Sequence, residues 1–132
     1  MATKNDRRLL FLLSAVLVAD AGADGVSASK RRVMNLHLRQ RFPGLDLAGR
    51  WALVGRALRG MPEISDGVAF LSLVEKQSHK LAQELDEAEQ RELMLMLLDV
   101  GIADKPVPET VERVLRTTAR PLGFADTLRM PA

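Results

Sequence analysis

Helical periodicity runs through nearly the whole chain and constrains its fold more than any other feature. Between residues 47 and 61, apolar residues recur at spacings of four, three, four and three positions, which places them on one stripe of a helix. This stripe consists of Leu47, Trp51, Val54, Leu58 and Met61. No segment alternates cleanly between apolar and polar residues, and there is no tyrosine. The sequence therefore predicts an all-α helical bundle.

Capping and breaking residues divide the pattern into about six or seven helices. The first is expected over about residues 6–22, and Ser27 is expected to cap the second. Pro43-Gly44 and 60–62 should end the second and third helices, since proline and glycine interrupt the helical pattern. The other predicted boundary residues are Asp46, Ser65 or Asp66, Asp86 with Glu89 as a capping box, and Pro121 with Gly123 as a stop. A short helix could follow residue 126.

The fifth predicted helix contains an apolar run at 93–98 that leaves no polar side. A helix that is apolar all round is typical of a buried position. We therefore expect this helix to be the central one.

Two segments of the chain resemble each other and suggest an internal repeat. Aligning Asp24 with Asp104 pairs Val33 with Val114, and each copy then reaches a glycine. The repeat-like units span about 9–44 and 88–124, each an apolar helix, an acidic turn, a second helix and a glycine stop. At 132 residues, the chain is expected to form one domain over 1–132.

The N-terminus has two interpretations. Lys4, Arg7 and Arg8 precede the apolar run 9–19, and Ala19-Asp20-Ala21 follows as in a secretory signal peptide. The similar run at 93–98 favours a buried first helix instead. Both runs are too short to span a membrane. We therefore expect a cytoplasmic protein, with export as the alternative if residues 1–21 are a signal.

The absence of cysteine excludes disulfides, thiolate metal sites and thiol catalysis. Charge is unevenly distributed although the net charge is only +2. Residues 30–59 contain eight basic groups and one acid, and residues 60–112 contain twelve acids and four bases. We call 30–59 the basic segment. Its charge is consistent with a solvated face, with attraction to the acidic half, or with docking of a charged partner.

Two acidic turns follow apolar segments of the chain, and they read Ala23-Asp24-Gly25-Val26 and Ala103-Asp104-Lys105-Pro106-Val107-Pro108-Glu109. These turns resemble those of the tellurite-resistance TerB-like family, and the likeness covers about 9–126. The motif of that family is an apolar helix ending in Ala-Asp-Gly, a turn with a β-branched residue and a second helix with an early glutamate. The first copy lacks the glutamate, and the second lacks the glycine. The resemblance implies a small stand-alone member without assigned activity, linked to stress or tellurite resistance.

The resemblance also implies weak binding of a divalent cation such as Ca²⁺ or Mg²⁺, with Asp24, Asp104 and Glu109 as ligands. Asp20 lies four residues before Asp24 and could join them if the first helix extends that far. Hard cations require several oxygen ligands of this kind. The alternative is that these acids cap helices or complement a helix dipole.

A second set of candidates is basic. Lys30, Arg31, Arg32, Arg56 and Arg59 could form a surface for a partner or an anion. We expect a protein partner, with a homodimer as one form. Nucleic acid or an anionic membrane is the less favoured alternative, because aromatic residues rarely interleave with the arginines.

Catalytic residues are not apparent. His79 and Glu75 are four residues apart, as in an ordinary helical ion pair, and no triad, phosphate loop or metal-hydrolase motif occurs. The sequence thus predicts a non-enzymatic binding or scaffold protein. The alternative is a basic module for nucleic acid or anionic lipid.

Overall fold

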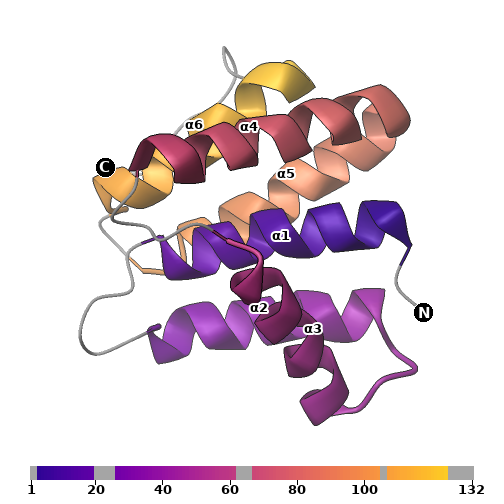
Figure 1. The fold of residues 1–132 in the computed structure, drawn as a ribbon. Coiled ribbons are helices and arrows are strands. Elements are labelled where there is room, and N and C mark those ends of the chain that lie inside the picture. The colour runs from indigo at the N-terminus through magenta and orange to yellow at the C-terminus, as the bar shows by residue number, and fades with distance from the viewer. Residues whose placement is uncertain (1–2, 20–25, 62–66, 105–106, 125–132) are drawn as a thin grey trace.

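A computed structural model describes residues 3–19, 26–61, 67–104 and 107–124. Six α-helices and no strand occur within these residues, which confirms the predicted all-α bundle (Figure 1). The helices are α1 (Lys4–Val18), α2 (Ala28–Arg41), α3 (Leu47–Arg59), α4 (Gly67–Glu84), α5 (Glu87–Gly101) and α6 (Glu109–Leu122). The expected turns at 20–25 and 62–66 and the expected helix after 126 lie outside the described residues.

Side-chain caps begin α2, α3 and α5 where the sequence predicts them. The Ser27 hydroxyl accepts the Lys30 N–H at 3.1 Å, and the Asp46 carboxylate accepts the Gly49 N–H at 2.7 Å. Asp86 and Glu89 form the predicted reciprocal capping box. Each such cap contributes about 1 kcal/mol by satisfying an otherwise unpaired backbone donor.

Three helix ends differ from the prediction. A second capping box, between Thr3 and Asp6, begins α1 earlier than expected, and α1 ends at Val18. At the other end of the chain, Pro121 lies inside the last turn of α6. Gly123 ends that helix by adopting a left-handed conformation with φ of 81°, which a residue with a Cβ rarely adopts.

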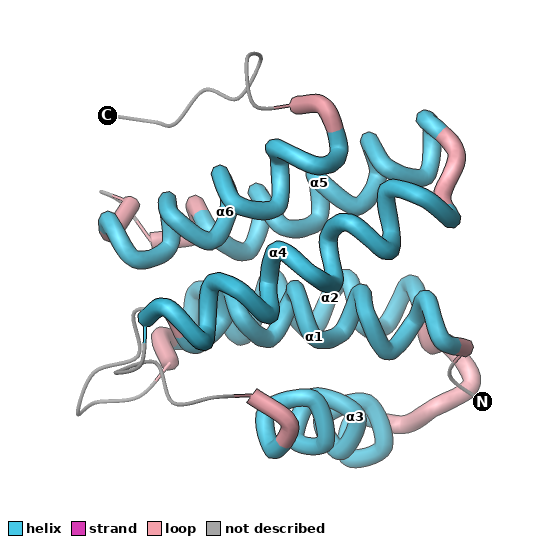
Figure 2. Tube along the Cα trace, turned by 45° about the horizontal axis from the view of Figure 1, so that its top comes forward, coloured by secondary structure: helices cyan, strands magenta, loops and turns pink. Residues whose placement is uncertain are grey.

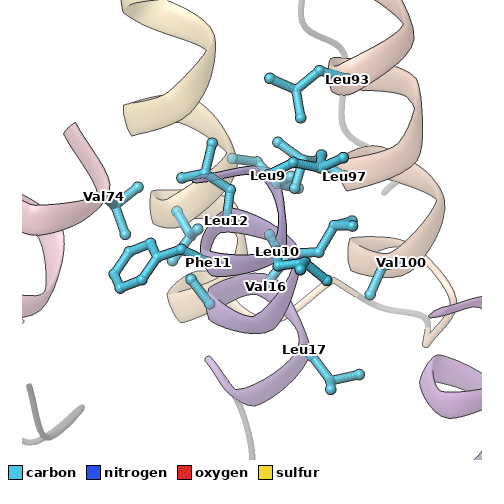
Figure 3. Close-up of a cluster of buried hydrophobic side chains, with 14 of the residues drawn as sticks. Leu9, Leu10, Phe11, Leu12, Val16, Leu17, Val74, Leu93, Leu97 and Val100 are labelled. Atoms are coloured by element: carbon cyan, nitrogen blue, oxygen red, sulfur yellow. The ribbon is translucent and has the colours of Figure 1, made fainter. Parts of the chain in front are cut away.

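The central helix is α1, not α5. Residues 9–17 are all buried, and α1 packs against each of the other five helices. Figure 3 shows side chains of α1 pointing toward Val74 of α4 on one side and Leu97 of α5 on the other. The expectation for α5 is wrong because this helix packs mainly on α1, α2 and α6 and leaves Leu95 56% exposed.

The two repeat-like helix pairs pack on each other in a reciprocal way. Helix α1 lies against α5 and α6, and α2 lies against α5. In Figure 2, α3 lies on the opposite side of α1 from α5 and α6. Three helices converge at Gly101, where an added Cβ would lie 2.9 Å from Leu115 Cδ1 and 3.3 Å from Val16 Cγ1. Glycine therefore permits the close approach of α1, α5 and α6.

The apolar stripes are buried less completely than predicted at their beginnings. Leu47, the first residue of α3, is 55% exposed, while Val54 of the same stripe is buried. Val68, near the beginning of α4, is also exposed, while Val74 is buried. In the described part of the chain, no helix is both long and apolar enough to cross a lipid bilayer.

Candidate anion-binding groove and basic segment

The structure describes only part of the predicted cation site. Asp104 is partly buried after α5, and Glu109 is exposed in the first turn of α6, where its carboxylate accepts a hydrogen bond from Arg113 at 2.6 Å. Asp20 and Asp24 lie outside the described residues. Among the residues that are described, no three His, Asp or Glu side chains gather in a way that could hold a metal ion.

The basic candidates divide into exposed and buried residues. Arg31, Arg32, Arg56 and Arg59 are exposed, as a partner surface requires. Lys30 is only 3% exposed, so its expected place on that surface is wrong. The reason is helical spacing, since Lys30 precedes the buried residues Met34 and Leu38 by four and eight positions and shares their side of α2.

Charge pairing within the bundle is mostly local. Three acids pair with an arginine one turn further along the same helix, and these pairs are Glu87–Arg91, Glu109–Arg113 and Glu112–Arg116. His37 in the basic segment lies 3.0 Å from Asp99 of α5 and links the two charge blocks. Within the described residues, no acid pairs with Arg31, Arg32, Arg39, Arg56 or Arg59. Among the described residues, attraction between the two halves therefore leaves these five cations uncompensated.

A groove of about 700 Å³ lies where α1, the end of α2 and α3 meet. Its polar lining consists of Arg7, Arg41 and Arg56 together with Asp6. Its apolar lining comes from α1, α3 and the connection between α2 and α3, and consists of Leu10, Phe42, Leu45, Leu53 and Ala57. The volume lies within the range of small-molecule sites, about 300–1,000 Å³. The groove is therefore an apolar depression with an excess of positive charge.

One ion pair fixes a wall of this groove. Nε and Nη2 of Arg41 donate to Oδ1 of Asp6 at 3.1 and 3.0 Å. The backbone N–H of Thr3 donates to the other carboxylate oxygen at 3.0 Å. Burial raises the pKa of Asp6, but the hydrogen bonds from Thr3 and Arg41 and the charge of Arg41 outweigh it, so the pKa lies below its ordinary value.

A second groove, of about 520 Å³, lies between α2, the α2–α3 connection and the beginning of α3. It is lined by Leu36, Arg39, Gln40, Pro43 and Arg50. Leu36 is 52% exposed, and the Arg50 guanidinium donates to the Leu45 carbonyl oxygen at 2.8 Å. Arginine and exposed leucine therefore occur together on this surface.

Each of the two histidines pairs with a carboxylate in the described structure. His79 lies 3.6 Å from Glu75, and both side chains are more than half exposed, as expected of a helical ion pair on the surface. His37 pairs with Asp99 between α2 and α5.

Sequence analysis missed Arg7, Arg41 and Asp6 as site residues. In the sequence, Arg7 belongs to the charged end of a signal-like segment, and Arg41 is one of eight basic residues of the basic segment. The Thr3–Asp6 capping box was the available signal, because it places Asp6 in the first turn of α1. The pairing of Asp6 with Arg41 across 35 positions was not readable from local pattern.

Comparison with protein families, curated proteins and solved structures found no match to this chain.

Proposed function

We propose that this chain is a non-enzymatic binding module whose basic segment docks an acidic protein partner. The observation that carries the proposal is the set of five exposed arginines without an acidic partner in the described bundle. Uncompensated surface charge attracts a ligand of opposite sign and speeds its association.

Exposed leucines favour a protein over a nucleic acid as the partner. Leu36, Leu45 and Leu47 are 40–55% exposed, and all three belong to the basic segment. Protein interfaces combine arginine with apolar side chains. Single-stranded nucleic acid is held instead by aromatic side chains on which bases stack. The one tryptophan, Trp51, packs against the core.

We also propose the TerB-like relationship, with stress or tellurite resistance as its setting. The reciprocal packing of α1–α2 on α5–α6 supports two related helix pairs. The implied cation site is tested by calorimetric titration with Ca²⁺ and Mg²⁺. A heat lost in a D104N/E109Q variant and kept in E112Q supports it, and no heat at millimolar cation contradicts it.

The docking proposal is tested with two labelled probes, a glutamate- and leucine-rich peptide and a DNA duplex, by fluorescence anisotropy at low and moderate salt. The peptide should bind, and an R31E/R39E variant should weaken binding about tenfold or more, because two attractive charges become repulsive. R120E, an exposed reversal on α6, is the matched control and should change it less than about twofold. Tighter binding of DNA with a steep salt dependence would contradict the protein partner and favour the nucleic-acid alternative.

A further inference from the structure

We infer that the groove between α1 and α3 binds a small amphiphile with one anionic head, of the fatty-carboxylate class. This inference goes beyond the docking proposal, because it concerns a different surface and a different class of ligand. The groove is lined by Arg7, Arg41 and Arg56 and by apolar side chains of α1, α3 and the connection between α2 and α3.

Charge complementarity identifies the head of the ligand. Asp6 compensates one of the three guanidinium groups by pairing with Arg41. Arg7 and Arg56 line the same groove, and neither side chain has an acidic partner among the described residues. The groove therefore carries an excess of two positive charges. A carboxylate is the simplest group that two or three guanidinium groups can hold through charge-assisted hydrogen bonds.

The apolar lining identifies the tail. Leu10 is 2% exposed and forms a buried part of the lining, whereas Leu45 is 40% exposed. Leu53 and Ala57 lie one turn apart on α3, and Arg56 lies beside them. An alkyl chain that covers this lining removes apolar surface from water, which a free phosphate or acetate ion would not do. A ligand with both parts uses the whole groove.

The proposed site is already ordered by contacts within the protein. The Asp6–Arg41 pair holds Arg41 in place, and the Thr3 N–H holds the other oxygen of Asp6. Pre-organised side chains lose less conformational entropy when a ligand binds. The wall formed by Arg41 and Phe42 is therefore available without rearrangement of α2.

The test is a calorimetric titration of the full chain with decanoate below its micelle concentration. Acetate and inorganic phosphate supply the head alone, and decanol supplies the tail alone. We expect saturable binding of decanoate at one site, and binding at least tenfold weaker for acetate, phosphate and decanol. Decanol bound as tightly as decanoate, or decanoate not bound at all, would overturn the inference.

Two matched pairs of variants locate the site. R56E should weaken decanoate binding about tenfold or more, whereas R59E makes the same charge change one turn further along α3 and should have an effect below about twofold. L45S should weaken binding several-fold, whereas L47S changes an exposed leucine outside the groove lining. Equal effects within each pair would show nonspecific attraction and overturn the inference.

Different variants test the docking of an acidic peptide and the binding of decanoate, so each proposal can be contradicted without the other. The R31E/R39E variant that tests peptide docking retains every residue of the groove lining, so its affinity for decanoate should be unchanged. Loss of decanoate binding in that variant would contradict the placement in this groove. An acidic peptide that displaces decanoate from the unmodified chain would show that the groove takes a protein segment, and would also overturn the inference.

Discussion

Arg41, the last residue of α2, donates two hydrogen bonds to one carboxylate oxygen of Asp6 in the first turn of α1. The Asp6 side chain is 13% exposed and that of Arg41 is 44% exposed. Because the same carboxylate also caps α1 through Thr3, one residue joins the beginning of the first helix to the end of the second. This contact should contribute to both stability and groove geometry.

Replacing Asp6 by asparagine should lower the free energy of unfolding at pH 7 by about 1–3 kcal/mol, because a charged acceptor with three donors is lost. Chemical unfolding followed by Trp51 fluorescence measures this directly, since the chain contains one tryptophan and no tyrosine. E87Q, in an exposed helical pair, is the control and should change stability by less than about 0.5 kcal/mol.

The Asp6 carboxylate should also make the free energy of unfolding depend on pH. The pKa of Asp6 is lower in the folded chain than its ordinary value of about 3.9, so the folded state binds the proton less tightly than the unfolded state. Its contribution is complete above about pH 5 and is lost as pH falls through the folded pKa. The free energy of unfolding, measured at pH 7, 5 and 3, should therefore decrease less with falling pH for D6N than for the unmodified chain. Equal decreases in the two chains would contradict this role of Asp6.

Gly101 and Gly55 both lie within helices but should respond oppositely to alanine. G101A should destabilise by about 1–3 kcal/mol, since its Cβ would press on Leu115 and on the stiff side chains of Val111 and Val16. G55A should stabilise by about 0.5–1 kcal/mol, because nothing lies within 4 Å of its added Cβ and alanine favours the helix. Thermal unfolding of the two variants provides the comparison.

Two leucines on α5 test which side of that helix is buried. L97A should cost about 2–5 kcal/mol, because Leu97 is fully buried against α1 and truncation leaves a cavity. L95A should cost less than about 0.5 kcal/mol, because Leu95 is 56% exposed. Similar losses in urea unfolding would contradict the observed orientation of α5.

The sequence predicted what local chemistry determines. The caps at Ser27, Asp46 and Asp86 are confirmed, because a side chain three residues from its backbone donor depends little on the rest of the fold. Burial was predicted less well. The run at 93–98 and the run at 9–19 look alike in sequence, and only packing decides that α1 is covered on all sides.

The candidate groove could be predicted even less from the sequence than burial, because it is formed by long-range contacts. Arg7, Arg41 and Arg56 belong to three different helices, and only their packing brings them to one groove. No spacing rule connects such residues. The burial of Lys30, in contrast, is predictable from local spacing. Lys30 lies four residues before the apolar Met34, which places both on the buried side of α2.

The central position of α1 has a consequence for synthesis of the chain on the ribosome. The helix that contacts all others is the first to emerge, while α4, α5 and α6 follow only after residue 66. Until then, the leucines of residues 9–17 lack most of the surfaces that bury them. The core of this domain is therefore completed only after its last helices have emerged, and α1 is a natural early client for a chaperone that shields apolar segments.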